Sequence, residues 1–136
     1  MSALFKKLQW SDQNEVFVLN APASFEPVCD ELEQEDIEIL RDLPANGTAD
    51  FVIMFVTEKQ QIDRYAPGLV ATLTDDPTLW FAYPKLSSKN IESDITRDDG
   101  WEKLSSLGYK PVRQVAIDED WSALRFRPQH LVKTRN

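Results

Sequence analysis

The chain has 136 residues, with 15 basic and 23 acidic side chains, a net charge of −8, and only 4 Gly, 1 Cys and 1 His. This length suits a single domain, which we expect over residues 1–128 with a tail at 129–136. A negative net field repels phosphate backbones, so we expect no nucleic-acid partner. A single cysteine, Cys29, excludes an internal disulfide, and no apolar run is long enough for a signal peptide or a membrane helix. We therefore expect a cytoplasmic protein with no membrane partner.

The first half of the chain alternates between helix and strand patterns. Phe25, Val28, Cys29 and Leu32 recur at helical spacing, and the segment 50–56 (DFVIMFV) is apolar on both faces, like a central parallel strand. In chain order we predict a short helix over 1–9, a strand over 15–20, a helix capped by Ser24, a weak strand at 38–40, the strand over 50–56, and a helix with a Thr57/Gln60 capping box and a kink or break at Pro67.

The second half continues this pattern and ends in two consecutive strands. A buried strand is predicted at 78–83, followed by a polar segment up to 95. The later elements are a helix capped by Thr96, with Asp98 and Asp99 in its first turn and Gly108 at its end, a strand over 111–117, a turn at 118–120 and a strand over 121–127.

This order of elements predicts an α/β fold. Strands that alternate with helices imply a parallel sheet with right-handed crossovers. The last two strands are too close in sequence for a crossover, so they must form an antiparallel hairpin. We predict a three-layer Rossmann-like sandwich with the sheet order 2-1-3-4-6-5. The layout resembles a methyltransferase-type Rossmann fold that is shortened at its front.

Three segments in the second half carry a more specific resemblance. They read LWFAYPKLSSK at 79–89, DITRDDGW at 94–101 and PVRQVAIDEDWSALRFRP at 111–128. They are similar to a family of small bacterial proteins with a domain of unknown function, whose pattern is LWxxYPKxxS, LTRDxxW and PVRQVAIDxxWSALRFR. Ile95 stands where that family has Leu. The likeness extends in layout over about residues 15–128, but it implies no reaction.

Candidate ligand-binding residues lie where strands reach the carboxyl edge of the predicted sheet, which is where open parallel sheets bind ligands. Lys85, Ser87, Ser88 and Lys89 can bind an anion, with Arg97 and the amino end of the helix after Thr96 in support. The alternative is a hydrated loop of common polar residues. The full set of candidates is Asn20, Tyr83, Lys85, Ser87, Ser88, Arg97, Asp118 and Trp121. Trp121 has two interpretations, a ring that stacks on a ligand or a cap on the core.

The usual cofactor and catalytic motifs of such folds are missing. The turn after the first predicted strand, Asn20 to Phe25, has no glycine and contains Pro22, so backbone and cofactor cannot approach closely. We expect no cofactor. The single histidine, His130, lies in the tail, and Cys29 lies on an apolar helix face, so we assign no catalytic residue. We also assign no metal ligands, and a hairpin turn explains the acids at 118–120 as well as a magnesium site does.

Three functions follow as hypotheses. The first is a non-catalytic binding or interaction module with a degenerate methyltransferase-like fold, whose partner is a small anion or a protein. The second is a small enzyme that acts on an anionic molecule with Lys85, Ser87, Asp118 and Trp121. The third is a homo-oligomer in which arginines of the final hairpin face a neighbour's acidic stretch. Residues 26–50 hold nine acids and one base, which is a solvated face or such a docking surface.

Overall fold

The computed structural model describes residues 3–11, 13–44 and 46–132, which form one six-stranded sheet with helices on both faces. The helical elements are α1 (Ala3–Lys7), η1 (Ala23–Phe25), α2 (Glu26–Gln34), α3 (Lys59–Thr72), α4 (Glu102–Ser106) and η2 (Gln129–Leu131). The strands are β1 (Glu15–Leu19), β2 (Glu38–Leu40), β3 (Ala49–Phe55), β4 (Leu73–Pro84), β5 (Tyr109–Ala116) and β6 (Trp121–Pro128). No helix in the described part of the chain is long and apolar enough to cross a membrane.

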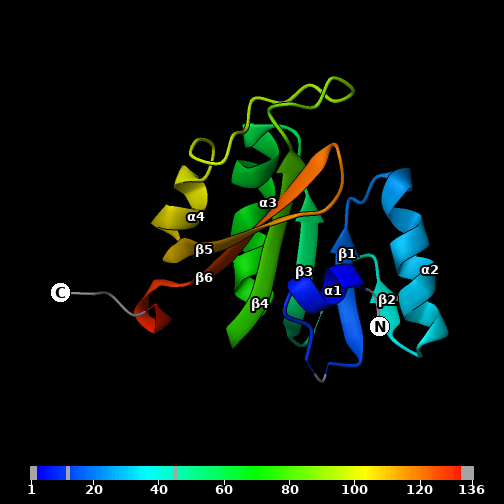
Figure 1. Cartoon of the computed structure of the whole chain (residues 1–136). Coiled ribbons are helices and arrows are strands. Elements are labelled where there is room, and N and C mark those ends of the chain that lie inside the picture. Colours follow the sequence, from blue (N-terminus) through cyan, green and yellow to red (C-terminus); the bar gives the residue numbers. More distant parts are fainter. Residues whose placement is uncertain (1–2, 12, 45, 133–136) are drawn as a thin grey trace.

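The sheet has the predicted order, β2-β1-β3-β4-β6-β5. The first four strands of this order pair in parallel, whereas β4 with β6 and β6 with β5 pair antiparallel. The α/β class, the strand order and the C-terminal hairpin are therefore confirmed. Because the carboxyl ends of β1, β3 and β4 reach one edge, the loop that follows β4 rises above that edge (Figure 1).

Two apolar cores make the fold a three-layer sandwich. Alternate residues of β1 show this, since Phe17 packs with α3 and α4 while Val18 packs with α1 and α2. Trp80 of β4 is fully buried under α1, and its indole N–H donates to the backbone oxygen of Leu8 at 3.0 Å. Cys29 is buried on the inner face of α2, and burial raises the pKa of its thiol, so it packs as a small apolar side chain.

The helix starts differ from those predicted. The segment after β1 first makes the 3₁₀ turn Ala23–Phe25, so α2 begins at Glu26 and Ser24 is not its cap. Pro27 lies in the first turn of α2, where a missing N–H is tolerated. The capping box of α3 lies one residue later than predicted and uses Glu58 and Gln61.

Pro67 does not break α3, which runs unbroken from Lys59 to Thr72. The lost N–H would have bonded to the carbonyl of Asp63, and both residues are exposed, so water can satisfy that carbonyl.

The helix predicted after Thr96 begins only at Glu102. Thr96 and Asp99 instead pair in an isolated bridge, and Gly100 follows with φ +114°, a value that side-chain-bearing residues rarely adopt. The indole N–H of Trp101 donates to the carbonyls of Thr96 and Arg97 at 2.9 and 3.1 Å. These carbonyls are those that a helix would use, so the buried indole holds the segment as a loop.

The α3 capping box gives a stability prediction. The side-chain oxygen of Gln61 accepts the backbone N–H groups of Thr57 and Glu58 at 2.7 and 3.1 Å. Gln61→Ala leaves both without this partner and should lower the free energy of unfolding by about 1 kcal/mol in urea denaturation. Gln34→Ala, at the exposed end of α2, is the matched control and should change it by less than about 0.5 kcal/mol. An equal effect of the two substitutions contradicts the assignment.

Candidate functional site

The strand order reverses between β1 and β3, and open α/β sheets bind ligands in the crevice at such a switch point. Here the crevice is bridged by the chain itself. Asn20 follows β1 with φ +60°, and its side-chain amide donates to the carbonyl of Phe55, the last residue of β3, at 2.9 Å. Asn20 thus ties the ends of the two strands together instead of reaching toward a ligand.

Aromatic rings fill the crevice on the α2 side of the sheet. Phe55 contacts Phe25 at a centroid distance of 4.8 Å and Trp121 at 5.1 Å, both edge to face. Trp121 is only 5% exposed. Of its two predicted interpretations, the structure therefore supports the cap on the core.

An ion pair also joins the ends of α2 and β2. The guanidinium of Arg41, just after β2, donates two hydrogen bonds to the Glu26 carboxylate at 2.9 and 2.7 Å. This pairing lowers the pKa of Glu26. The carboxylate stands at the amino end of α2, where a nucleotide-binding fold would place a phosphate or carboxyl group of its cofactor.

These residues do not fit a nucleotide or S-adenosylmethionine cofactor. The turn after β1 has no glycine, and the first turn of α2 carries the acid Glu26. The rings of Phe25, Phe55 and Trp121, which we call the Phe55 cluster, occupy the switch point. A hollow of about 290 Å³ remains on the α3 side, between Asn20, Arg41 and Tyr65. Two of its polar groups are already engaged, the Asn20 amide with the Phe55 carbonyl and the Arg41 guanidinium with Glu26.

The long loop after β4 is fixed to the β5–β6 turn through Asp120. The Lys85 N–H donates to the Asp120 backbone oxygen at 2.7 Å, and one Asp120 carboxylate oxygen accepts from Ser88 at 2.8 Å and Asn90 at 3.2 Å. Asp118 closes the turn itself, because its carboxylate accepts the backbone N–H groups of Asp120 and Trp121 at 2.8 and 2.9 Å. Ser88 and Asp118 therefore both have structural partners.

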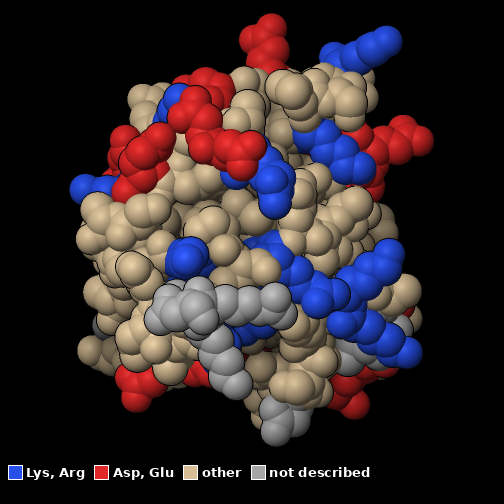
Figure 2. All heavy atoms as spheres, turned by 60° about the vertical axis from the view of Figure 1, so that its left-hand side comes forward, with Lys and Arg blue, Asp and Glu red and all other residues tan. Residues whose placement is uncertain are grey.

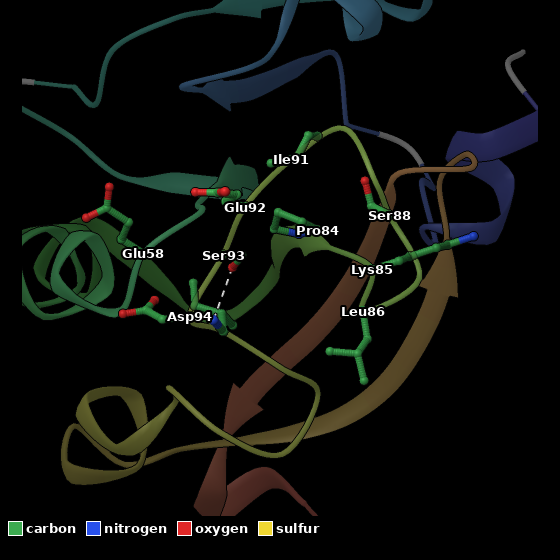
Figure 3. A pocket seen from close by; sticks show the side chains of 10 residues that line it. Glu58, Pro84, Lys85, Leu86, Ser88, Ile91, Glu92, Ser93 and Asp94 are labelled. Carbon is green, nitrogen blue, oxygen red and sulfur yellow. Dashed lines mark hydrogen bonds between the residues drawn. The ribbon is translucent and has the colours of Figure 1, made fainter.

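One side of this loop lines a hollow of about 640 Å³ that is rich in carboxylates (Figure 3). Glu58, Glu92 and Asp94 gather at one end of it, and the side chain of Lys85 extends in the other direction (Figure 3). Two of these acids serve the start of α3, since Glu58 caps the helix and Asp94 accepts the Lys59 N–H at 2.7 Å. The charge of this hollow is unsuited to an anion.

A second hollow, of about 520 Å³, lies between the same loop, the 96–99 turn and the hairpin. Its volume falls in the usual range of ligand sites. Its lining brings together Tyr83, Lys85, Leu86, Ser87, Thr96, Arg97, Asp98, Gln114 and Ser122. We call it the Tyr83 hollow.

Cations and hydroxyls dominate the polar groups of the Tyr83 hollow. In the described part of the chain, the Lys85 ammonium forms no ion pair, and Arg97 approaches only Asp98, at 3.6 Å with both side chains mostly exposed. Such a pair contributes little. The Gln114 amide donates to the Tyr83 hydroxyl at 2.9 Å, which leaves the phenol proton free to donate elsewhere. Burial raises the pKa of Tyr83, so this proton is retained at neutral pH.

The structure thus brings together four of the eight predicted candidates, Tyr83, Lys85, Ser87 and Arg97. Asn20, Ser88, Asp118 and Trp121 have the structural contacts described above. The predicted support from a helix amino end at Thr96 is wrong, because α4 starts at Glu102. Gln114 and Ser122 were missed. Both point to the α3–α4 side of the sheet, since Gln114 pairs with Leu124 and Ser122 lies two positions before Leu124, and this period of two was a usable signal.

Comparison with known proteins supports the fold. No protein-family profile matches the chain, and no curated protein matches it either. Solved structures do match. A SAM-dependent methyltransferase from Aquifex aeolicus superposes with TM-score 0.64 at 13% identity, over 92% of this chain and 87% of the other. A protein of the NADB-Rossmann superfamily from Streptococcus agalactiae gives 0.54 at 8% identity, over 98% and 71%. A fibrillarin/Nop5p complex gives 0.50 at 12% identity, over 86% and 73%.

These superpositions show a methyltransferase-like Rossmann fold, and at such low identities they show no activity. The resemblance to the small bacterial family stays a prediction. Within the described residues, no group of three or more His, Cys, Asp and Glu side chains is placed to hold a metal ion.

The contacts of Asp120 predict how the loop after β4 is held. Asp120→Ala removes the acceptor of Ser88 and Asn90, so backbone amides over 86–91 should exchange with deuterium at least fivefold faster. Glu119→Ala, at the exposed neighbouring position, should leave exchange unchanged. Hydrogen–deuterium exchange with mass spectrometry measures both, and equal rates in the two variants contradict the anchor.

Proposed function

We propose that the chain is a non-catalytic binding module that holds a small anionic ligand in the Tyr83 hollow. The observation that carries this proposal is that Lys85 and Arg97, neither in a close ion pair within the described residues, both line a partly apolar hollow of about 520 Å³. A carboxylate or phosphate group there would meet two cations, the Ser87 hydroxyl and the phenol proton of Tyr83. Charge-assisted hydrogen bonds of this kind are stronger than neutral ones.

The lining argues for binding and against catalysis. A serine nucleophile needs a base within hydrogen-bond reach. The only titratable groups around Ser87 in this hollow are Tyr83, which keeps its proton, two cations, and the exposed carboxylate of Asp98. The enzyme hypothesis also used Asp118 and Trp121. Asp118 caps the hairpin turn and Trp121 packs on Phe55, so neither contributes to this lining.

The methyltransferase-like neighbours give a second, independent argument for the same proposal. Their fold suggests a cofactor crevice at the switch point, and in this chain that crevice is filled by Asn20 and the Phe55 cluster. A binding function that has moved one strand along, to the end of β4, is compatible with the frame that remains.

The anion site is tested by titration with inorganic phosphate and with citrate, followed by amide NMR shifts. We expect the shifts to centre on residues 85–88 and 96–98. Lys85→Gln with Arg97→Gln should weaken binding at least tenfold, since both cations line the hollow. Lys89→Gln, in the same loop but outside the lining, is the matched control and should change affinity less than twofold. Shifts spread over all surface lysines, or none with either anion, would sink the proposal.

The filled switch point gives an independent prediction. Isothermal titration with S-adenosylmethionine, ATP and NAD should show no binding at micromolar concentrations, because the Phe55 cluster and the Glu26–Arg41 pair leave no cradle for a nucleotide. A micromolar Kd for any of the three contradicts the structural argument for a lost cofactor site.

A further inference from the structure

Four cationic side chains project from one face of the C-terminal hairpin. Arg125 and Arg127 alternate along β6, so both point to the sheet face that Ala123 shares with the α1–α2 core. Lys110 of β5 lies opposite Arg127, and Arg113 lies opposite Arg125. Residues opposed across antiparallel strands point to the same side. These four cations form what we call the basic face, and Figure 2 shows Lys and Arg side chains in a band across this side of the molecule.

An irregularity in β5 brings Arg113 onto the basic face. The register shifts between Pro111 and Arg113, which leaves Val112 as an extra residue. Without this shift, strict alternation from Lys110 would turn Arg113 to the opposite face, because it lies three positions further on. A β-bulge redirects side chains in this way. The local structure therefore adds a cation to a surface that already holds three.

The chain neutralises this surface only in part. Within the described residues, Arg127 alone among the four forms an ion pair, with Nε and Nη2 donating to Asp76 at 3.1 and 3.0 Å. Arg125 donates to the neutral side chain of Gln9, and its Nε is buried without a described partner. Like charges directly opposite each other destabilise a hairpin. This hairpin has two such pairs, Lys110 with Arg127 and Arg113 with Arg125. Locally unfavourable arrangements of this kind concentrate at functional surfaces.

The other edge of the same sheet is acidic. β2 is the edge strand there, and α2 packs beside it (Figure 1). The one base of this region, Arg41, is taken by Glu26. Five exposed carboxylates make no ion pair in the described part of the chain, and we call them the acidic edge: Asp30, Glu31, Glu33, Asp36 and Glu38.

We propose that the basic face of one molecule docks on the acidic edge of a second copy, so that the chain associates head to tail. The two edges of a six-stranded sheet are about 24 Å apart, so the surfaces cannot meet within one molecule. Each molecule offers one surface of each sign, and such a heterologous contact repeats from copy to copy. The contact does not use the Tyr83 hollow, which opens on the other face of the hairpin.

The net charge of −8 does not prevent this contact at moderate salt. At about 0.1 M ionic strength the Debye length is about 10 Å, shorter than the separation of the two edges, so an approaching molecule feels each edge separately. At about 1 M the Debye length is about 3 Å, and the exposed pairs are screened as well. Association should therefore be present at the lower ionic strength and lost at the higher one.

Sedimentation velocity of the full chain at these two ionic strengths tests the proposal. Lys110→Glu with Arg113→Glu should lower the association constant at least tenfold at about 0.1 M salt, and Asp30→Lys with Glu33→Lys should do the same. A mixture of the two variants should regain association, because each reversed surface then meets a complementary one. All four positions are exposed, and circular dichroism checks that the fold is kept.

Arg64→Glu with Lys103→Glu is the matched control. It makes the same change in net charge on α3 and α4 and should keep wild-type association. A wild-type protein that stays monomeric up to about 1 mM, a basic-face variant that associates normally, or a mixture that stays monomeric each overturns the proposal. The proposal is also overturned if the wild type is monomeric and binds immobilised heparin while the basic-face variant does not. The basic face would then bind a polyanion and not a second copy.

Discussion

The arrangement of the whole carboxyl edge of the sheet depends on Phe55, the last residue of β3. Its carbonyl accepts the Asn20 amide, and its ring is enclosed by Phe25 and Trp121. These contacts join β1, the turn before α2 and the hairpin at the position where the fold would otherwise open to a cofactor. A Rossmann frame needs small residues and free backbone N–H groups there to bind a nucleotide. This chain uses the same position to complete its core.

Because aromatic rings fill the switch point, the solvent-accessible polar groups that could bind a ligand lie at the end of β4 instead. Because Trp101 holds the 96–99 turn and Asp120 holds the 85–95 loop, the segments on either side of the Tyr83 hollow are both fixed to the framework. Neither segment depends on a long helix, since α4 has only five residues. The hollow is therefore positioned by hydrogen bonds of side chains, from the Trp101 indole to two carbonyls and from Ser88 and Asn90 to the Asp120 carboxylate. Loops acquire defined shapes on rigid scaffolds in this way.

The sequence predicts the sheet better than it predicts the loops, for physical reasons. Strand order follows from apolar runs and connection lengths, which are local, and the chain obeys them. The helix starts depend on competition among nearby capping groups, so Ser24 and Thr96 looked suitable but lost to a 3₁₀ turn and to the indole of Trp101. Three of the four candidates in the hollow lie close together in the sequence at the end of β4, and Arg97 joins them from the turn that the Trp101 indole holds. Of the other four, Asp118 has its partners within its own turn, whereas Asn20, Ser88 and Trp121 contact residues 32 to 66 positions away, which no local pattern reveals.

The bulge at Val112 links the two surfaces of the hairpin. Beyond it, Gln114 faces the Tyr83 hollow and bonds the phenol, while Arg113 faces the opposite side and lies across from Arg125. A regular strand of the same composition would exchange these directions, which would place a third cation beside Lys85 and Arg97 and remove one from the basic face. The extra residue thus sets the charge of both surfaces at once.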